Sequence, residues 1–177
     1  MVNERGLGGN HTTIYRWTQD YGSELERRCR PYLKPTNDLW RVDETYIKVK
    51  GKDKYLYRAV DSKGNTLDFL LTAKRDTAAA KRFFRQTLGA LHTSPPRVIT
   101  VDKNPAYPKA IDELKADKQL FNKVKLRQKK YLNNIIEQDH RSIKRLVKPG
   151  MGFSSFNTAR RTLKGYEMMN KKAQGTN

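Results

Sequence analysis

LWRVDETYIKVKGKDKYLYRAVDSKGNTLDFLL, residues 39–71, holds three runs that are rich in β-branched and aromatic residues. These runs cover 39–49, 54–60 and 65–71. The short intervals between them, Gly51–Asp53 and Ser62–Asn65, have the residue types of hairpin turns. The stretch therefore predicts three consecutive antiparallel strands.

Helical and strand patterns alternate after this stretch. Residues 76–88 open with the helix-capping Asp76 and stop at Gly89, which predicts a helix. The apolar run 97–102, RVITVD, predicts a buried strand that ends in Asp102. The remaining predicted elements are a short helix at 105–114, a strand near 121–126, and helices at about 134–147 and 158–172. Antiparallel hairpins followed by strand–helix–strand units predict an α/β fold with a mixed sheet.

The chain is strongly basic. It has 177 residues, with 37 Lys or Arg against 18 Asp or Glu, so its formal net charge is +19. This length suits one ordinary domain with a small appendage, and the charge calls for a polyanionic partner. No run of about 18 apolar residues and no signal-peptide core occurs, so we expect no membrane partner and a cytoplasmic, nucleoid-associated bacterial protein. A single cysteine and three scattered histidines make a zinc module improbable.

Two acids stand on predicted strands. Alternation puts Asp43 and Glu44 on opposite faces of their strand, so at most one of the two can point into a given site. Asp102 follows an apolar strand, where ligand sites of α/β sheets are built. Each acid has a structural alternative, since Asp43 could be salt-bridged within the sheet and Asp102 could start a turn.

A third acid lies on the predicted helix at 134–147. Glu137, Arg141 and Lys144 share the face opposite the apolar one. The structural alternative is an ordinary exposed Glu–Arg pair on a helix. Three acids held together would suit phosphodiester cleavage, because carboxylates bind the two divalent ions that such reactions use.

Three motifs in fixed order resemble the catalytic domain of bacterial insertion-sequence DDE transposases, most closely the cointegrate-forming group. They are WRVDETY at 40–46, TVD at 100–102 and NIIEQDHR at 134–141, followed by Lys144-Arg145. Asp102 and Glu137 are separated by 34 residues, and Lys144 lies seven positions after Glu137, as in that group. The resemblance covers nearly all of residues 37–172.

The resemblance implies an RNase H-like, retroviral-integrase-like fold and a catalytic, metal-binding triad of Asp43, Asp102 and Glu137. Two Mg²⁺ or Mn²⁺ ions per site, cleavage at the 3′ ends of the element, strand transfer into target DNA and a homo-oligomer are implied with it. Glu44 would face away from this site. The residues expected to contact DNA are Lys144, Arg141, Arg145, Lys129, Lys130, His11, Thr12, Thr13 and Arg16. His140 would contact DNA or support a metal ligand, and a structural role for it is an equal alternative.

The N-terminal region differs from the family pattern. HTTIYRW at 11–17 resembles the recognition helix of a helix-turn-helix, yet only ten residues precede it, so we expect a shortened copy with doubtful binding of terminal repeats and doubtful activity. The alternative is a helix at 12–28 that packs a stripe of Ile14, Trp17, Tyr21 and Leu25 onto the domain. The expected parts are a helix-turn-helix remnant at 1–30, a linker at 31–37, the catalytic domain at 38–172 and a tail at 173–177.

Two other functions remain open. The segment 118–148 holds ten Lys or Arg against two acids, with aromatic residues interleaved, which also suits a basic nucleic-acid-binding protein without chemistry. An RNase H-like nuclease that cuts without strand transfer would use the same metal site. No exposed apolar stripe is evident in the sequence to account for oligomer contacts.

Overall fold

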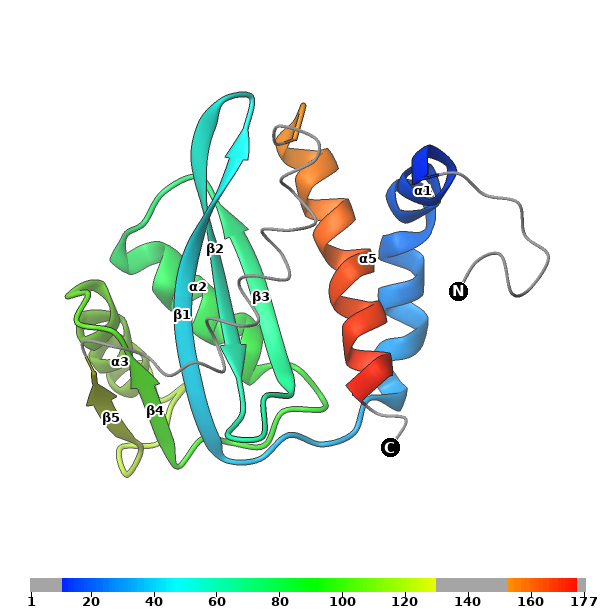
Figure 1. Cartoon of the computed structure of the whole chain (residues 1–177). Helices are drawn as coiled ribbons and strands as arrows, with labels where there is room; N and C mark the ends of the chain where they lie inside the picture. Colours follow the sequence, from blue (N-terminus) through cyan, green and yellow to red (C-terminus); the bar gives the residue numbers. More distant parts are fainter. Residues whose placement is uncertain (1–10, 130–152, 175–177) are drawn as a thin grey trace. The chain divides into compact units, whose positions relative to one another are not determined.

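The computed structural model describes residues 11–129 and 153–174 (Figure 1). Its helices and strands are α1 (His11–Cys29), the 3-10 helix η2 (Arg30–Tyr32), β1 (Leu39–Val49), β2 (Lys52–Val60), β3 (Thr66–Thr72), α2 (Thr77–Leu88), β4 (Val98–Val101), α3 (Ala106–Ala116), β5 (Lys125–Gln128) and α5 (Phe156–Gln174). They form two compact units, which are Lys34–Phe153 and Met1–Leu33 with Ser154–Asn177.

The larger unit is built on a five-stranded sheet in the order β3-β2-β1-β4-β5. β1 pairs antiparallel with β2, and β2 pairs antiparallel with β3. β4 runs parallel to both β1 and β5. The prediction of a mixed sheet that begins with three antiparallel strands is therefore confirmed.

The first hairpin turns earlier than its sequence suggested. Val49 pairs with Lys52, so the loop consists of Lys50 and Gly51, which have φ angles of 50° and 71°. A two-residue loop with positive φ at both positions matches the twist of the paired strands, and this preference outweighs the turn-forming residue types at 52–53. β2 consequently starts at Lys52 rather than at residue 54.

One face of the sheet is covered by α2 and α3 (Figure 1). α2 begins as predicted, because the Asp76 side chain accepts a hydrogen bond from Ala79 N at 2.8 Å. The core between sheet and helices is apolar and includes Trp40, Val42, Tyr57, Phe83, Phe84, Ile99, Tyr107, Ile111 and Leu114. Such burial of aromatic and aliphatic side chains is the main stabilising contribution to the unit.

β5 is displaced along the chain from its prediction. It covers Lys125–Gln128 instead of 121–126, and the residues before it turn. Phe121 precedes the strand and is 63% exposed.

The smaller unit is a helix pair in which α1 contacts α5. A Cβ atom at Gly22 would lie 3.0 Å from the carbonyl oxygen of Arg161 and 3.2 Å from Gly165 Cα, so glycine permits this close approach. Lys164 and Glu26 form an ion pair at 2.6 Å. The helix contact therefore includes a small residue that permits close approach and a charge pair.

The side chains of the α1 stripe that the structure describes do not pack against α5. Trp17, Tyr21 and Leu25 are 43%, 64% and 39% exposed. They form an exposed apolar stripe at i, i+4 and i+8, although none was expected from the sequence. Within the described ranges, no helix is long and apolar enough to cross a membrane.

Candidate active site

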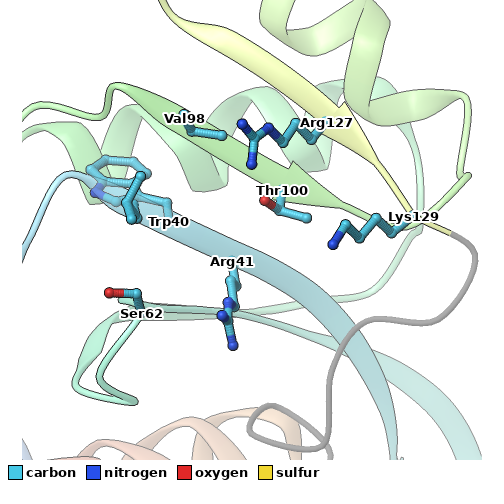
Figure 2. A pocket seen from close by; sticks show the side chains of 8 residues that line it. Trp40, Arg41, Ser62, Val98, Thr100, Arg127 and Lys129 are labelled. Atoms are coloured by element: carbon cyan, nitrogen blue, oxygen red, sulfur yellow. The ribbon is translucent and has the colours of Figure 1, made fainter.

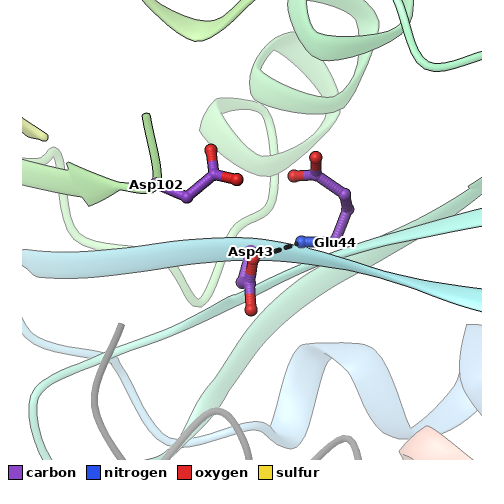
Figure 3. Close-up of side chains that lie close together, drawn as sticks. All are labelled: Asp43, Glu44 and Asp102. Carbon is purple, nitrogen blue, oxygen red and sulfur yellow. Dashed lines mark hydrogen bonds between the residues drawn. The ribbon is translucent and has the colours of Figure 1, made fainter. Parts of the chain in front are cut away.

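Asp43 and Asp102 are brought level by the pairing of two neighbouring parallel strands. Arg41 of β1 pairs with Thr100 of β4, and each acid lies two residues further along. One carboxylate oxygen each from Asp43, Glu44 and Asp102 lies within 4.8 Å of the others. The first two acids of the predicted triad are therefore adjacent, although they are far apart in the sequence (Figure 3).

Glu44 belongs to this cluster, so the prediction that it faces away was wrong. The side chains of Asp43 and Glu44 do leave β1 on opposite sides (Figure 3). However, Asp102 lies just beyond the end of β4, so the direction of its side chain does not follow the alternation of that strand. Its Oδ1 accepts a hydrogen bond from Asn104 N at 2.9 Å, and its carboxylate points towards Glu44.

The carboxylate of Glu44 is fully engaged by neighbouring donors. Oε1 accepts hydrogen bonds from Arg75 Nε and, at 3.1 Å, from Asn104 Nδ2, while Oε2 accepts one from the Tyr107 hydroxyl. The side chain is only 2% exposed. Burial, followed by the charge of Glu44, raises the pKa of Tyr107, which keeps its hydroxyl protonated as a donor. Glu44 is thus a buried anchor for its neighbours rather than an open ligand.

Asp43 carries the strongest electrostatic signal in the cluster. Burial raises its pKa to about 7, the hydrogen bond from Glu44 N opposes the rise, and the charges of Glu44 and Asp102 add to it. Burial and the neighbouring carboxylates therefore disfavour the charged form of Asp43, which a bound cation would favour. Hard oxygen donors at this separation, with negative charge in excess, suit Mg²⁺ or Mn²⁺. Asp43 and Asp102 are the residues that would hold such an ion.

Arg75 is a functional candidate that the sequence did not reveal. It lies between β3 and α2 and contacts both Glu44 and Asp102, the latter with Nη2 to Oδ2 at 3.4 Å. The order and direction of the strands could have indicated that Arg75 lies near the acids. β3 runs in the same direction as β1 and β4, so the residues that follow it reach the edge where Asp102 lies.

Lys129 lines a small basic pocket on the larger unit (Figure 2). The pocket has a volume of about 110 Å³ and is also lined by Arg41, Arg127 and Trp40. In the described part of the chain, Arg41 Nη1 and Trp40 Nε1 are buried and have no hydrogen-bond partner. The lining residues Arg41, Arg127 and Lys129 make the pocket cationic, which is compatible with the DNA contact predicted for Lys129.

The other predicted site residues fall into two groups. Glu137, His140, Arg141, Lys144, Arg145 and Lys130 lie outside the described residues, so their roles stay predictions. His11, Thr12, Thr13 and Arg16 lie on α1 in the smaller unit. Arg16 is exposed there, as a DNA contact requires. The structure thus brings together two of the three predicted catalytic acids and leaves the third to experiment.

The fold and the pair of acids agree with the RNase H-like catalytic domain that the sequence motifs implied. The structure resembles the magnesium complex of the catalytic core of human T-cell leukaemia virus type 2 integrase, with a TM-score of 0.52 and 19% identity over 66% of this chain and 74% of that one. It also resembles the core of bovine immunodeficiency virus integrase, with a TM-score of 0.53 and 14% identity over 72% and 80% of the two chains. These similarities confirm the RNase H-like fold.

Sequence comparison identifies the family. Residues 37–176 match the DDE domain of IS240-type transposases. The chain is 41% identical over 173 residues to two Staphylococcus aureus proteins, the transposase of the element IS431mec and that of IS257 in transposon Tn4003. In each case 94% of this chain and 72% of the relative are covered. The chain belongs to the DDE transposases of bacterial insertion sequences, whose DNA chemistry depends on divalent metal ions.

Proposed function

We propose that this protein cleaves the 3′ ends of its insertion sequence and transfers them to target DNA, with Asp43, Asp102 and Glu137 as the metal-binding triad. The observation that carries the proposal is the adjacency of Asp43 and Asp102 on parallel strands, together with the raised pKa of Asp43. A pair of divalent ions at such a site would activate the nucleophile and stabilise charge on the attacking and leaving oxygens. The roles of Asp43 and Asp102 are to hold these ions, and Glu137 completes the second site.

The DNA partners in this proposal are the element ends and the target. Lys144 holds the element end, while Arg141, Arg145, Lys130 and Lys129 bind the backbone nearby. The net charge of +19 favours such contacts, because each phosphate that a cation neutralises releases a condensed counterion. His11, Thr12, Thr13 and Arg16 make further DNA contacts from α1. The protein acts as a homo-oligomer on chromosomal DNA in the cytoplasm.

The test is a cleavage and joining assay with labelled element-end DNA and Mg²⁺. Each of Asp43→Asn, Asp102→Asn and Glu137→Gln is expected to abolish products while DNA binding stays within about twofold. Asp112→Asn, at an exposed acid on α3, is the matched control and should retain full activity. Full activity in any triad variant contradicts the assignment of that residue.

The same assay separates the two alternatives. Binding without any cleavage by the parent protein would favour a basic nucleic-acid-binding protein. Cleavage without joined products would favour a nuclease that lacks strand transfer. Products of both kinds, lost together in the triad variants, are the result that the proposal requires.

A further inference from the structure

Arg75 lies between the buried Glu44 and Asp102, an acid that would bind metal. Its Nε and Nη2 contact the buried carboxylate of Glu44, and its Nη2 also reaches Asp102 Oδ2 at 3.4 Å. The Arg75 side chain is 33% exposed and that of Asp102 is 27% exposed. The guanidinium therefore serves as an internal cation for an acid that a divalent ion would bind.

The two contacts of Arg75 are unequal. Glu44 is held in place by Asn104 and Tyr107 and is excluded from water, which fixes its end of the pair. The contact with Asp102 is long and open to solvent, and such ion pairs contribute little. A divalent ion on Asp102 would therefore displace Arg75 from that acid but leave it attached to Glu44.

The charge of the site changes sign when metal binds. Glu44, Arg75 and the proposed triad contribute four carboxylates and one guanidinium, so their formal charge is −3 when all are ionised. Two divalent ions would make it +1, which removes the attraction between Arg75 and the acids that the ions occupy. The N–H donors that leave Asp102 then lie beside the metal site, where they can bind an anionic group. The anionic group that the DNA substrate supplies is a phosphate.

We propose that Arg75 exchanges partners during the reaction, neutralising Asp102 in the metal-free protein and binding a DNA phosphate beside the acids once metal is present. This inference rests on the proposed function and adds a substrate-binding residue to it. Arginine suits this role because its planar fork can keep one edge on Glu44 while the other binds a phosphate oxygen. Glu44 is the positioning residue that keeps the fork in place.

The first measurement is metal binding by the DNA-free protein. Replacement of Arg75 by glutamine removes the competing cation, so Mn²⁺ affinity is expected to rise about two- to fivefold, as suits a weak, partly exposed ion pair. Arg85→Gln is the matched control, because Arg85 lies on α2 and its partners among the described residues are Asp117, at 3.0 Å, and Gln119. Its Mn²⁺ affinity should be unchanged.

The second measurement is binding of element-end DNA with Mg²⁺ and with EDTA. Mg²⁺ should raise the affinity of the parent protein, and Arg75→Gln should lose about tenfold or more of that gain while its affinity in EDTA stays unchanged. Arg75→Lys should recover only part of the gain, since its ammonium cannot contact Glu44 and a phosphate as a fork does. Glu44→Gln should behave like Arg75→Gln in this assay.

The combination of tighter metal binding and weaker metal-dependent DNA binding is the signature of partner exchange. A purely structural role for Arg75 would weaken both, and that result, or no change in either, overturns the proposal. Neither measurement requires cleavage, so an inactive parent protein would argue against the proposed function without affecting this test. Thermal unfolding of each variant confirms that it folds.

Discussion

Replacement of Asp43 by asparagine should stabilise the metal-free protein, and the gain should grow with pH. The pKa of Asp43 is raised from 3.8 to about 7, mainly by burial. An acid with a raised pKa binds more protons in the folded than in the unfolded state, so it lowers stability as pH rises from about 4 through about 7. Asparagine removes this charge and has nearly the same shape.

The size of the effect follows from the two pKa values. The full shift of about 3 pH units lowers the free energy of unfolding by about 4 kcal/mol at pH 8. At pH 5 the loss is about 2 kcal/mol. The stability difference between Asp43→Asn and the parent protein in EDTA should therefore increase by roughly 2 to 3 kcal/mol from pH 5 to pH 8. Saturating Mg²⁺ should shrink or reverse the advantage, because only the parent keeps both metal ligands.

Urea unfolding followed by Trp40 fluorescence measures this difference. Trp40 is 1% exposed in the larger unit, and Trp17→Phe would remove the other tryptophan, which is 43% exposed in the smaller unit. Asp112→Asn serves as the exposed-acid control and should show no such pH dependence. An equal advantage for Asp43→Asn at pH 5 and pH 8 would refute the electrostatic account of the site.

Three further predictions concern packing, a turn and DNA contact. Gly22→Ala should cost about 1 to 3 kcal/mol in thermal unfolding, because its Cβ would meet backbone atoms of α5 at 3.0–3.2 Å, whereas Gly89→Ala should be nearly neutral. Asp61→Ala should cost about 3 kcal/mol in urea unfolding, because the fully buried carboxylate accepts hydrogen bonds from Asn37 N, Lys63 N and Asn65 N. Lys129→Ala should lower the slope of log affinity for DNA against log salt by about 0.9 if Lys129 contacts one phosphate.

Each of these three has a clear contrary outcome. Unchanged stability in Gly22→Ala would mean that α1 and α5 do not approach as closely as the structure shows. Asp61→Asn should retain part of the stability that alanine loses, and equal losses would argue against a hydrogen-bonding role. An unchanged salt slope in Lys129→Ala would remove that residue from the DNA interface.

Local patterns explain why much of the fold was predictable. Alternating and β-branched residues indicated β1, β2 and β3, and the cap at Asp76 located the start of α2 within one residue. The errors fell where local signals compete. Backbone twist moved the first hairpin turn to Lys50 and Gly51, and the strand expected near 121–126 covers Lys125–Gln128 instead.

The candidate site was only partly predictable because it depends on contacts between distant segments. Asp43 and Asp102 stood out as acids in apolar strands, which is an unfavourable placement without a function. Glu44 was misjudged because alternation fixes directions only within a strand, while Asp102 lies beyond one. Arg75 and Tyr107 carry no local motif, and only the direction of β3 and the position of α3 bring them to the acids.

The parallel pairing of β1 with β4 also bears on the order of folding. The hairpins of β1, β2 and β3 join neighbouring segments, but β4 pairs with β1 only after α2 and a further loop have been made. Such long-range contacts close late, because the entropy of a long loop must be overcome first. During synthesis, Asp43 is therefore in place on its hairpin well before the site is complete. Asp43 and Asp102 come together only when Val98–Val101 joins the sheet.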